Sequence, residues 1–199
     1  MRATLLLSTL LFVLCLAACD RDEPEEDEVA NSPATLPVTQ WDFRPEAETW
    51  SAASLAALND HGAPLLSIVP EDIETYCPDY AALDDTGRAR FWTTFLSALA
   101  KHESTWRPDA VGGEGRWFGL VQISPATARG YGCNATTGTA LQNGAANLSC
   151  AIRIMAVTVP RDGVISRGGG GVAADWGPFS SDRKRSDIQD WTRSRPYCG

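Results

Sequence analysis

Residues 84–104 read DDTGRARFWTTFLSALAKHES and carry the pattern that decides the fold. Large apolar side chains recur three, four and seven positions apart, which is the spacing of one face of an α-helix. These side chains are Phe91, Trp92, Phe95, Leu96 and Leu99. The polar run Asp84-Asp85-Thr86 before them is typical of a helix N-cap. We therefore expect a core-facing helix from about Gly87 to Ser104.

Glu103 lies four residues after Leu99, so it falls on the same face of this helix. A carboxyl group in that position is poorly solvated, and the loss of solvation raises its pKa. The helix dipole acts in the same direction, because a negative charge is disfavoured near a helix C-terminus. A carboxylic acid that stays protonated near neutral pH is suited to general acid catalysis. The alternative is a structural glutamate that reaches solvent or pairs with Lys101 or Arg107.

Helix signals also dominate the rest of the chain. Ser124 and Pro125 form an N-cap followed by a proline at the first helical position, which predicts a short helix. Only residues 118–123 have a strand signal, and it is weak. The sequence predicts a mainly α single domain over residues 37–199. Besides the helix that ends at Ser104, we expect helices over residues 46–59, 125–130, 139–159 and 186–193.

The N-terminus predicts export as a lipoprotein. An apolar run from Leu5 to Leu16 follows a short positive start and is shorter than the about 20 residues that span a bilayer. The run leads into Ala17-Ala18-Cys19, and this end resembles the lipobox of bacterial lipoproteins, whose cysteine is acylated. The alternative is ordinary signal-peptide cleavage beside an incidental cysteine. We expect a signal peptide over residues 1–18 and a lipid anchor at Cys19.

Residues 19–36 predict a flexible acidic linker. Seven of them are acidic and one is an arginine, a composition that cannot bury enough apolar surface to fold. The chain carries a net charge of −8, of which this segment supplies −6, so the domain that follows is only mildly acidic. Such a domain offers no basic surface for nucleic acid. We expect the protein in the bacterial cell envelope, anchored by lipid and facing the periplasm, and Asp20 favours the inner membrane.

Four cysteines remain after the expected anchor, and an even number in an oxidising compartment predicts two disulfides. Of the three possible pairings we favour Cys133–Cys150, which closes a local loop, together with Cys77–Cys198, which holds the C-terminus. A zinc site is the competing interpretation. Zinc is disfavoured because C-x2-C spacing is absent and the two histidines, His61 and His102, lie far apart in the sequence.

Three segments together resemble the bacterial lytic transglycosylases of the SLT type, which have a lysozyme-like fold. Glu103-Ser104 ends a helix as in that family. About fifteen residues later, residues 119–123 read GLVQI and are similar to the family's Gly-Leu-Met-Gln-Ile segment. Asn147 precedes an apolar face like that of the family's long helix. The resemblance covers roughly residues 85–180 and implies a lysozyme-like domain that cleaves the glycan strands of peptidoglycan.

The resemblance implies roles for the matched positions. Glu103 is the single acid/base, and Ser104 helps to hold the glycan or the catalytic carboxyl. Gly119 allows the backbone to approach a sugar, and Gln122 hydrogen-bonds an N-acetyl or hydroxyl group. The alternatives are a polar residue at a helix end for Ser104, a turn for Gly119 and an exposed strand residue for Gln122. No metal or organic cofactor is implied.

One segment departs from the family's pattern. Where the family carries a Tyr-Asn pair, residues 173–178 read AADWGP, so the tyrosine that supports the catalytic glutamate is missing. Trp176 becomes a candidate for stacking on a sugar, and Asp175 a candidate for a hydrogen bond. Tyr131 or Tyr197 are candidates for replacing the tyrosine in space.

The implied reaction is non-hydrolytic cleavage between N-acetylmuramic acid and N-acetylglucosamine, with formation of a 1,6-anhydro ring. One alternative is a muramidase of the same fold that uses water, with Glu114, Asp109 or Asp175 as its base. Another is a peptidoglycan-binding lipoprotein without catalytic activity, which the missing tyrosine makes conceivable. The expected partners are peptidoglycan glycan strands and, through the anchor, a membrane.

Overall fold

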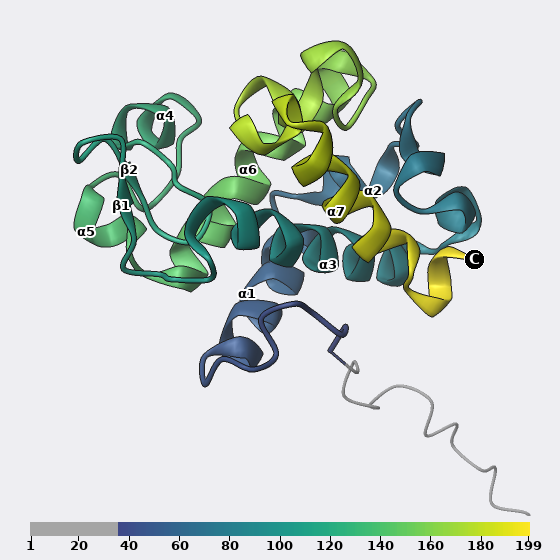
Figure 1. Ribbon diagram of the computed structural model, residues 1–199, viewed down its shortest axis with the longest axis horizontal. Coiled ribbons are helices and arrows are strands. Elements are labelled where there is room, and N and C mark those ends of the chain that lie inside the picture. The colour runs from purple at the N-terminus through teal and green to yellow at the C-terminus, as the bar shows by residue number, and fades with distance from the viewer. Residues whose placement is uncertain (1–35) are drawn as a thin grey trace, which may run out of the picture. The chain divides into compact units, whose positions relative to one another are not determined.

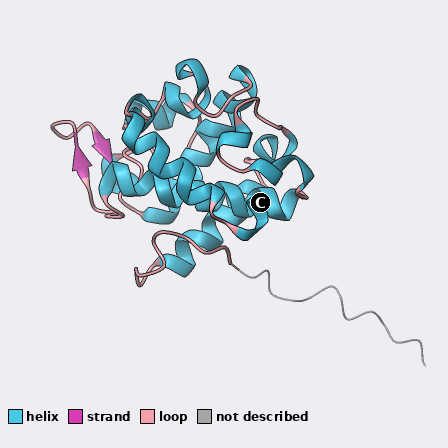
Figure 2. Cartoon of the chain, turned by 45° about the vertical axis from the view of Figure 1, so that its right-hand side comes forward, coloured by secondary structure: helices cyan, strands magenta, loops and turns pink. Residues whose placement is uncertain are grey.

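Helices account for most of residues 36–199, the part of the chain that the computed structural model describes (Figure 1). The prediction of a mainly α fold is confirmed. Two short strands, β1 (Val111–Gly112) and β2 (Trp117–Phe118), form an antiparallel hairpin at one side (Figure 2). The α-helices are α1 (Ala47–Asn59), α2 (Ala63–Ser67), α3 (Asp85–Ser104), α4 (Pro125–Gly130), α5 (Gly138–Leu141), α6 (Gly144–Asp162) and α7 (Asp182–Arg193). The 3-10 helices are η1 (Ile73–Thr75), η2 (Pro78–Ala82), η3 (Arg167–Gly169), η4 (Gly171–Ala174), η5 (Gly177–Ser180) and η6 (Pro196–Cys198).

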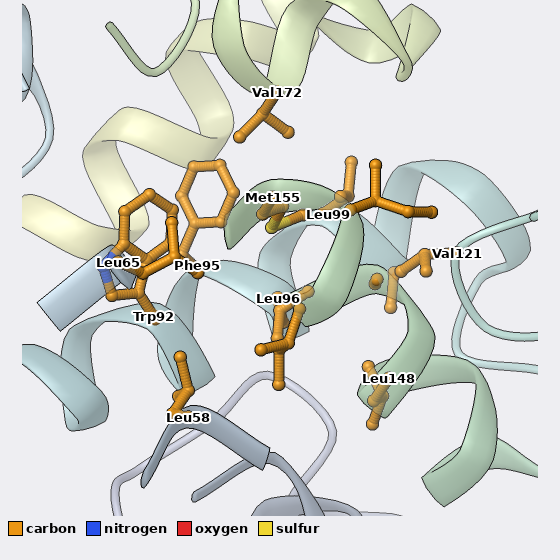
Figure 3. Close-up of a cluster of buried hydrophobic side chains, with 14 of the residues drawn as sticks. Leu58, Leu65, Trp92, Phe95, Leu96, Leu99, Val121, Leu148, Met155 and Val172 are labelled. Carbon is orange, nitrogen blue, oxygen red and sulfur yellow. The ribbon is translucent and has the colours of Figure 1, made fainter. Parts of the chain in front are cut away.

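Helix α3 is the centre of the hydrophobic core, and α1, α2 and α7 pack against it. Its predicted apolar stripe is fully buried, and Trp92, Phe95 and Leu99 lie among apolar side chains from the other helices (Figure 3). Helix α6 brings Met155 and Leu148 into the same core. Each large apolar side chain buried in this way stabilises the fold by about 1.5–3 kcal/mol.

The two predicted N-caps are both present. The Asp84 carboxylate accepts a hydrogen bond from the Gly87 amide at 2.7 Å, so α3 begins at Asp85, two residues earlier than expected. The Ser124 hydroxyl accepts one from the Thr127 amide at 3.0 Å and starts α4 over the predicted residues. Each side-chain cap satisfies one of the amides that a helix leaves unpaired at its first turn.

The expectation of one helix over residues 139–159 is wrong, because two helices occupy this region. Asn143 separates α5 from α6, and its side-chain oxygen accepts a hydrogen bond from the Ala146 amide at 3.0 Å. An asparagine that caps a new helix interrupts the old one, since the capping residue itself is not helical. Helix α7 also differs from its prediction, because it begins at Asp182 rather than at residue 186.

The expected strand over residues 118–123 is wrong beyond its first residue. Gly119 with φ of 84° and Gln122 with φ of 51° turn the chain back on itself. Phe118 and Ile123 therefore pair with each other through two backbone hydrogen bonds of 3.0 Å. The segment is a tight loop held at its ends, which places Gln122 at the turn.

Both favoured disulfides are confirmed. Cys133–Cys150 joins the loop after α4 to α6, and Cys77–Cys198 joins the start of η2 to the C-terminal turn η6. The bonds close loops of very different length, with sequence separations of 17 and 121.

The expected signal peptide, the lipid site at Cys19 and all of the acidic linker except Leu36 lie outside the described residues. Within residues 36–199, no helix is both long and apolar enough to cross a membrane.

Candidate active site

Glu103 lies in the last turn of α3, one residue before the helix ends. The next residue but one, Thr105, has φ of 54°, so the chain leaves the helix directly after the turn that carries the carboxyl group. Burial raises the pKa of Glu103 from 4.5 to about 7, although the positive charge of Lys184 acts to lower it. The direction of this pKa shift is the one that the sequence predicts. Near neutral pH, a large share of the Glu103 side chains is therefore protonated.

Glu103 forms no hydrogen bond or ion pair with any residue of the described part of the chain. The two partners proposed for a structural glutamate are engaged elsewhere. The Lys101 ammonium lies 2.8 and 2.9 Å from the two carboxylate oxygens of Asp187. The Arg107 guanidinium lies 3.7 Å from a carboxylate oxygen of Asp109. A salt-bridged Glu103 is thus excluded, and the carboxyl group stays available to a ligand.

The Glu103 carboxyl group borders a groove of about 480 Å³. One side, which we call the hairpin wall, consists of Gly112, Gly113, Trp117 and Gln122. The other side, which we call the C-terminal wall, consists of residues 175–178 and Lys184 of α7. His102 and Glu103 lie between them at the end of α3. Because the walls come from segments far apart in the sequence, the groove exists only in the folded chain.

Trp117 gives the hairpin wall an aromatic surface that the sequence did not reveal. Its side chain is 43% exposed although tryptophan is normally covered. The ring lies over Gly113, where an added Cβ would be 2.1 Å from it, so the glycine makes room for this arrangement. The guanidinium of Arg116 lies 5.0 Å from the ring centroid. An exposed aromatic ring beside a groove is suited to packing on the apolar face of a sugar.

Gln122, a predicted binding residue, does line the groove. Its amide nitrogen donates to the carbonyl oxygens of Gly119 at 2.8 Å and Ala110 at 3.3 Å. These bonds fix the side chain and leave its oxygen to accept a hydrogen bond at the hairpin wall. Its role toward the glycan remains a prediction.

Two other predicted binding residues, Gly119 and Ser104, do not line the groove. A Cβ on Gly119 would lie 2.1 Å from the Leu141 carbonyl oxygen, so the glycine is required for close packing inside the domain. The Ser104 hydroxyl donates to the Leu120 carbonyl oxygen at 2.8 Å and ties α3 to the loop of residues 119–123. Both residues thus hold Gln122 in place, and direct contact with a sugar remains a prediction for them.

Trp176 lies in the C-terminal wall but is only 4% exposed. Its indole nitrogen donates to the Val121 carbonyl oxygen at 2.8 Å, which ties this wall to the loop that carries Gln122. A covered ring presents little surface to a sugar, so Trp117 is the better placed of the two tryptophans for stacking. Asp175 lines the same wall, and burial raises the pKa of its carboxyl group.

Neither tyrosine suggested as a replacement for the family's tyrosine lines the groove. The Tyr197 hydroxyl is 2.9 Å from that of Thr94, on another part of α3, and Tyr131 lies at the end of α4. The structure therefore supports neither replacement.

Of the three residues suggested as an alternative base for hydrolysis, Asp175 lines the groove, whereas Asp109 and Glu114 are exposed outside it.

Asp187 ties helix α7 to the end of α3 that carries Glu103. This carboxylate contacts Lys101 and also lies 2.8 Å from the Nε2 atom of His102. Burial lowers the pKa of His102, and the interaction with Asp187 opposes that effect. Lys184 precedes Asp187 by three residues, which places both on the same face of the helix. The sequence does not reveal this arrangement, because it joins side chains more than eighty residues apart.

No group of three or more His, Cys, Asp or Glu side chains in residues 36–199 is placed to hold a metal ion.

Comparisons with known proteins agree with this geometry. Residues 83–161 match the family described as transglycosylase SLT domain, and this range includes Glu103 and Gln122. The solved structure of wild-type DslA is similar with a TM-score of 0.74 and 28% identity, covering 84% of this chain and all of that one. Two DslA structures in which one glutamate is replaced by glutamine match with the same TM-score, 29% identity and the same coverage. No curated protein matches this chain significantly.

Proposed function

Since this chain belongs to the SLT-type, lysozyme-like family, we propose that it is a lytic transglycosylase that cleaves peptidoglycan glycan strands with Glu103 as its acid/base. One observation carries the proposal. A carboxyl group with a pKa of about 7, which forms no hydrogen bond or ion pair within residues 36–199, faces a groove between two walls, in the segment that matches the family.

The proposed reaction breaks the bond between C1 of N-acetylmuramic acid and O4 of N-acetylglucosamine. Protonated Glu103 donates its proton to the glycosidic oxygen, and the N-acetylglucosamine leaves with a free 4-hydroxyl group. The carbonyl oxygen of the muramoyl N-acetyl group stabilises the positive charge at C1. The Glu103 carboxylate then removes the proton of the muramoyl 6-hydroxyl group, whose oxygen bonds to C1 and closes the 1,6-anhydro ring. Glu103 ends the cycle protonated, so one carboxyl group serves both steps.

The test is the mass of the muropeptides released from purified sacculi. A lytic transglycosylase yields products that end in 1,6-anhydro sugar, lighter by one water than the products of hydrolysis. The chain with Glu103→Gln provides the control, because an amide keeps the size of the side chain but transfers no proton. Binding of sacculi by the wild-type chain without any released fragment would instead identify a glycan-binding protein.

Hydrolysis by the same groove is the second candidate, and one observation favours it. The glutamates replaced in the two DslA variants lie eleven positions apart in that chain, which is also the interval between Glu103 and Glu114. A second carboxylate that activates water is typical of glycosidases. Glu114, exposed on the turn between β1 and β2 with φ of 58°, is the residue that would supply it.

The Glu114→Gln variant separates the two reactions. If the chain is a transglycosylase, this variant releases anhydro products at the wild-type rate, because Glu114 takes no part. If the chain is a hydrolase, wild-type products carry the extra water and the Glu114→Gln variant loses activity.

We also propose that the domain is held at a membrane of the bacterial cell envelope, facing the periplasm, by lipid on Cys19. The proposal rests on the apolar run that ends in Leu16-Ala17-Ala18-Cys19. Replacement of Cys19 by Ala is expected to move the protein out of the membrane fraction or to stop its processing. A mature N-terminus other than an acylated Cys19 would contradict the proposal. Fractionation of the two envelope membranes tests the preference for the inner one that Asp20 suggests.

A further inference from the structure

Lys184 is the charged residue of the groove that the proposed reaction leaves unused. It lines the C-terminal wall and acts on Glu103 through its positive charge. It forms no hydrogen bond or ion pair with any residue between 36 and 199. The neighbouring cationic side chains form ion pairs, Lys101 with Asp187 and Arg185 with Asp182. An ammonium group that forms no ion pair inside a groove is available to an anionic ligand.

The position of Lys184 is held by the contacts of its helix with α3. Asp187, one turn further along α7, binds both Lys101 and His102 beside Glu103. Arg185 donates to the Phe179 carbonyl oxygen at 2.8 Å and fixes the start of α7 against η5. These contacts tie the turn of α7 that carries Lys184 to both α3 and η5. The fold therefore directs the Lys184 charge toward the acid/base rather than toward solvent at large.

The sugars of a peptidoglycan strand offer few negative charges near the cleaved bond. The lactyl group of muramic acid ends in a carboxylate when it is free, and in a neutral amide when a peptide is attached to it. Asp175 on the same wall repels a second negative charge, so an anionic substituent is favoured only near Lys184. A charge-assisted bond from an ammonium to a carboxylate is about twice as strong as a neutral hydrogen bond.

We infer that Lys184 recognises the free muramoyl carboxylate, so that the groove prefers glycan strands from which the peptides have been removed. This inference rests on the proposed action on peptidoglycan. It also predicts a place in a reaction sequence: an amidase that releases the peptides makes the preferred substrate.

The test measures affinity with the full chain carrying Glu103→Gln, which keeps the strands intact during the experiment. Three probes are compared: peptide-free strands with free carboxylates, the same strands after conversion of the carboxylates to amides, and strands that retain their peptides. We expect the free-carboxylate strands to bind about tenfold more tightly than the amidated ones. The peptide-bearing strands are expected to bind like the amidated ones. Equal affinity for the first two probes would overturn the inference.

Variants at α7 assign the preference to one side chain. Lys184→Met removes the charge and keeps the length of the side chain, so the tenfold ratio is expected to fall to about one. Lys184→Arg keeps the charge and is expected to keep most of the ratio. Arg183→Met removes a charge from an exposed neighbour outside the groove and serves as the control for net charge. An unchanged ratio in folded Lys184→Met would overturn the inference.

The outcome is separable from that of the proposed function. Tighter binding of peptide-bearing strands would place the recognised carboxylate on the peptide and overturn the assignment to the muramoyl group. Release of glycan fragments by the Glu103→Gln chain at the wild-type rate would contradict the proposed function, whatever the affinity ratio.

Discussion

The two walls of the groove are built in different ways. The hairpin wall consists of residues close together in the sequence: Gly113 makes room for Trp117, and the turn at Gly119 presents Gln122. The C-terminal wall depends on contacts between distant segments, such as the bond from Trp176 to Val121. The family's motif survives in the first wall and is replaced in the second. The proposed chemistry therefore rests on Glu103 and the first wall, and the proposed choice of strand rests on the second.

Glu103 lies between the walls, and its replacement has the largest expected effect. Glu103→Gln is expected to lower the rate of glycan cleavage by about 10²–10⁴-fold, the usual contribution of a positioned acid/base. The measurement is the rate of release of soluble fragments from purified sacculi. A rate equal to that of wild type would make Glu103 a structural residue and remove the basis for comparing the two walls as parts of one active site.

Glu103→Gln is also expected to change the free energy of unfolding. The folded state raises the pKa of Glu103 to about 7, so ionisation costs stability as pH rises from the unfolded value of 4.5 through 7. Glutamine avoids this cost. Glu103→Gln is therefore expected to leave the free energy of unfolding unchanged at low pH and to increase it above pH 7, by at most about 3 kcal/mol. Urea unfolding at both ends of this range provides the measurement, and a variant less stable at high pH would contradict the burial of the carboxyl group.

The two disulfides close loops of very different length, so their contributions to stability can be compared. Replacing Cys77 and Cys198 with serine removes the bond that fastens the chain end after α7, and replacing Cys133 and Cys150 removes the one beside α6. Each pair of changes is expected to cost about 2–4 kcal/mol, and the first pair should cost more because its bond closes the longer loop. Urea unfolding without reductant measures both. A larger loss from the second pair would show that strain or residual structure outweighs loop length.

Much of α3 and of the helix caps was predictable because the signals are local. The stripe on α3, the caps at Asp84 and Ser124, and the burial of Glu103 follow from spacing along one segment. The predicted disulfides also agree with the structure. The position of Lys184 was not predictable, because it depends on how α7 packs against α3 through Asp187. Trp117 was missed for a different reason: a short strand in a glycine-rich turn has no periodicity to mark its exposed face.

The two tryptophans of the groove differ in burial, so their replacement is expected to affect different properties. Trp117→Ala removes an exposed ring, so we expect kcat/KM to fall about tenfold with little change in stability. Trp176→Ala removes a buried ring and its hydrogen bond, so it should cost about 3–5 kcal/mol of unfolding free energy. Kinetics on sacculi and urea unfolding of both variants separate the two effects. If Trp117→Ala left the kinetics unchanged, the hairpin wall would not contact the glycan.

The smallest expected effect is that of the charge on the C-terminal wall on the pKa of Glu103. Activity should decline as pH rises through the pKa of Glu103, because the first step needs its proton. The charge of Lys184 lowers this pKa, so Lys184→Met should move the alkaline limit to higher pH, and Lys184→Arg should leave it in place. The other ionisable groups lining the groove are His102 and Asp175. Burial lowers the pKa of His102 and raises that of Asp175, and both residues are unchanged in these variants. The measurement is kcat/KM against pH on strands with amidated carboxylates, which supply no muramoyl charge to neutralise Lys184. If the limit stayed in place or moved to lower pH in Lys184→Met, the charge on the second wall would not reach Glu103, and the two walls would act independently.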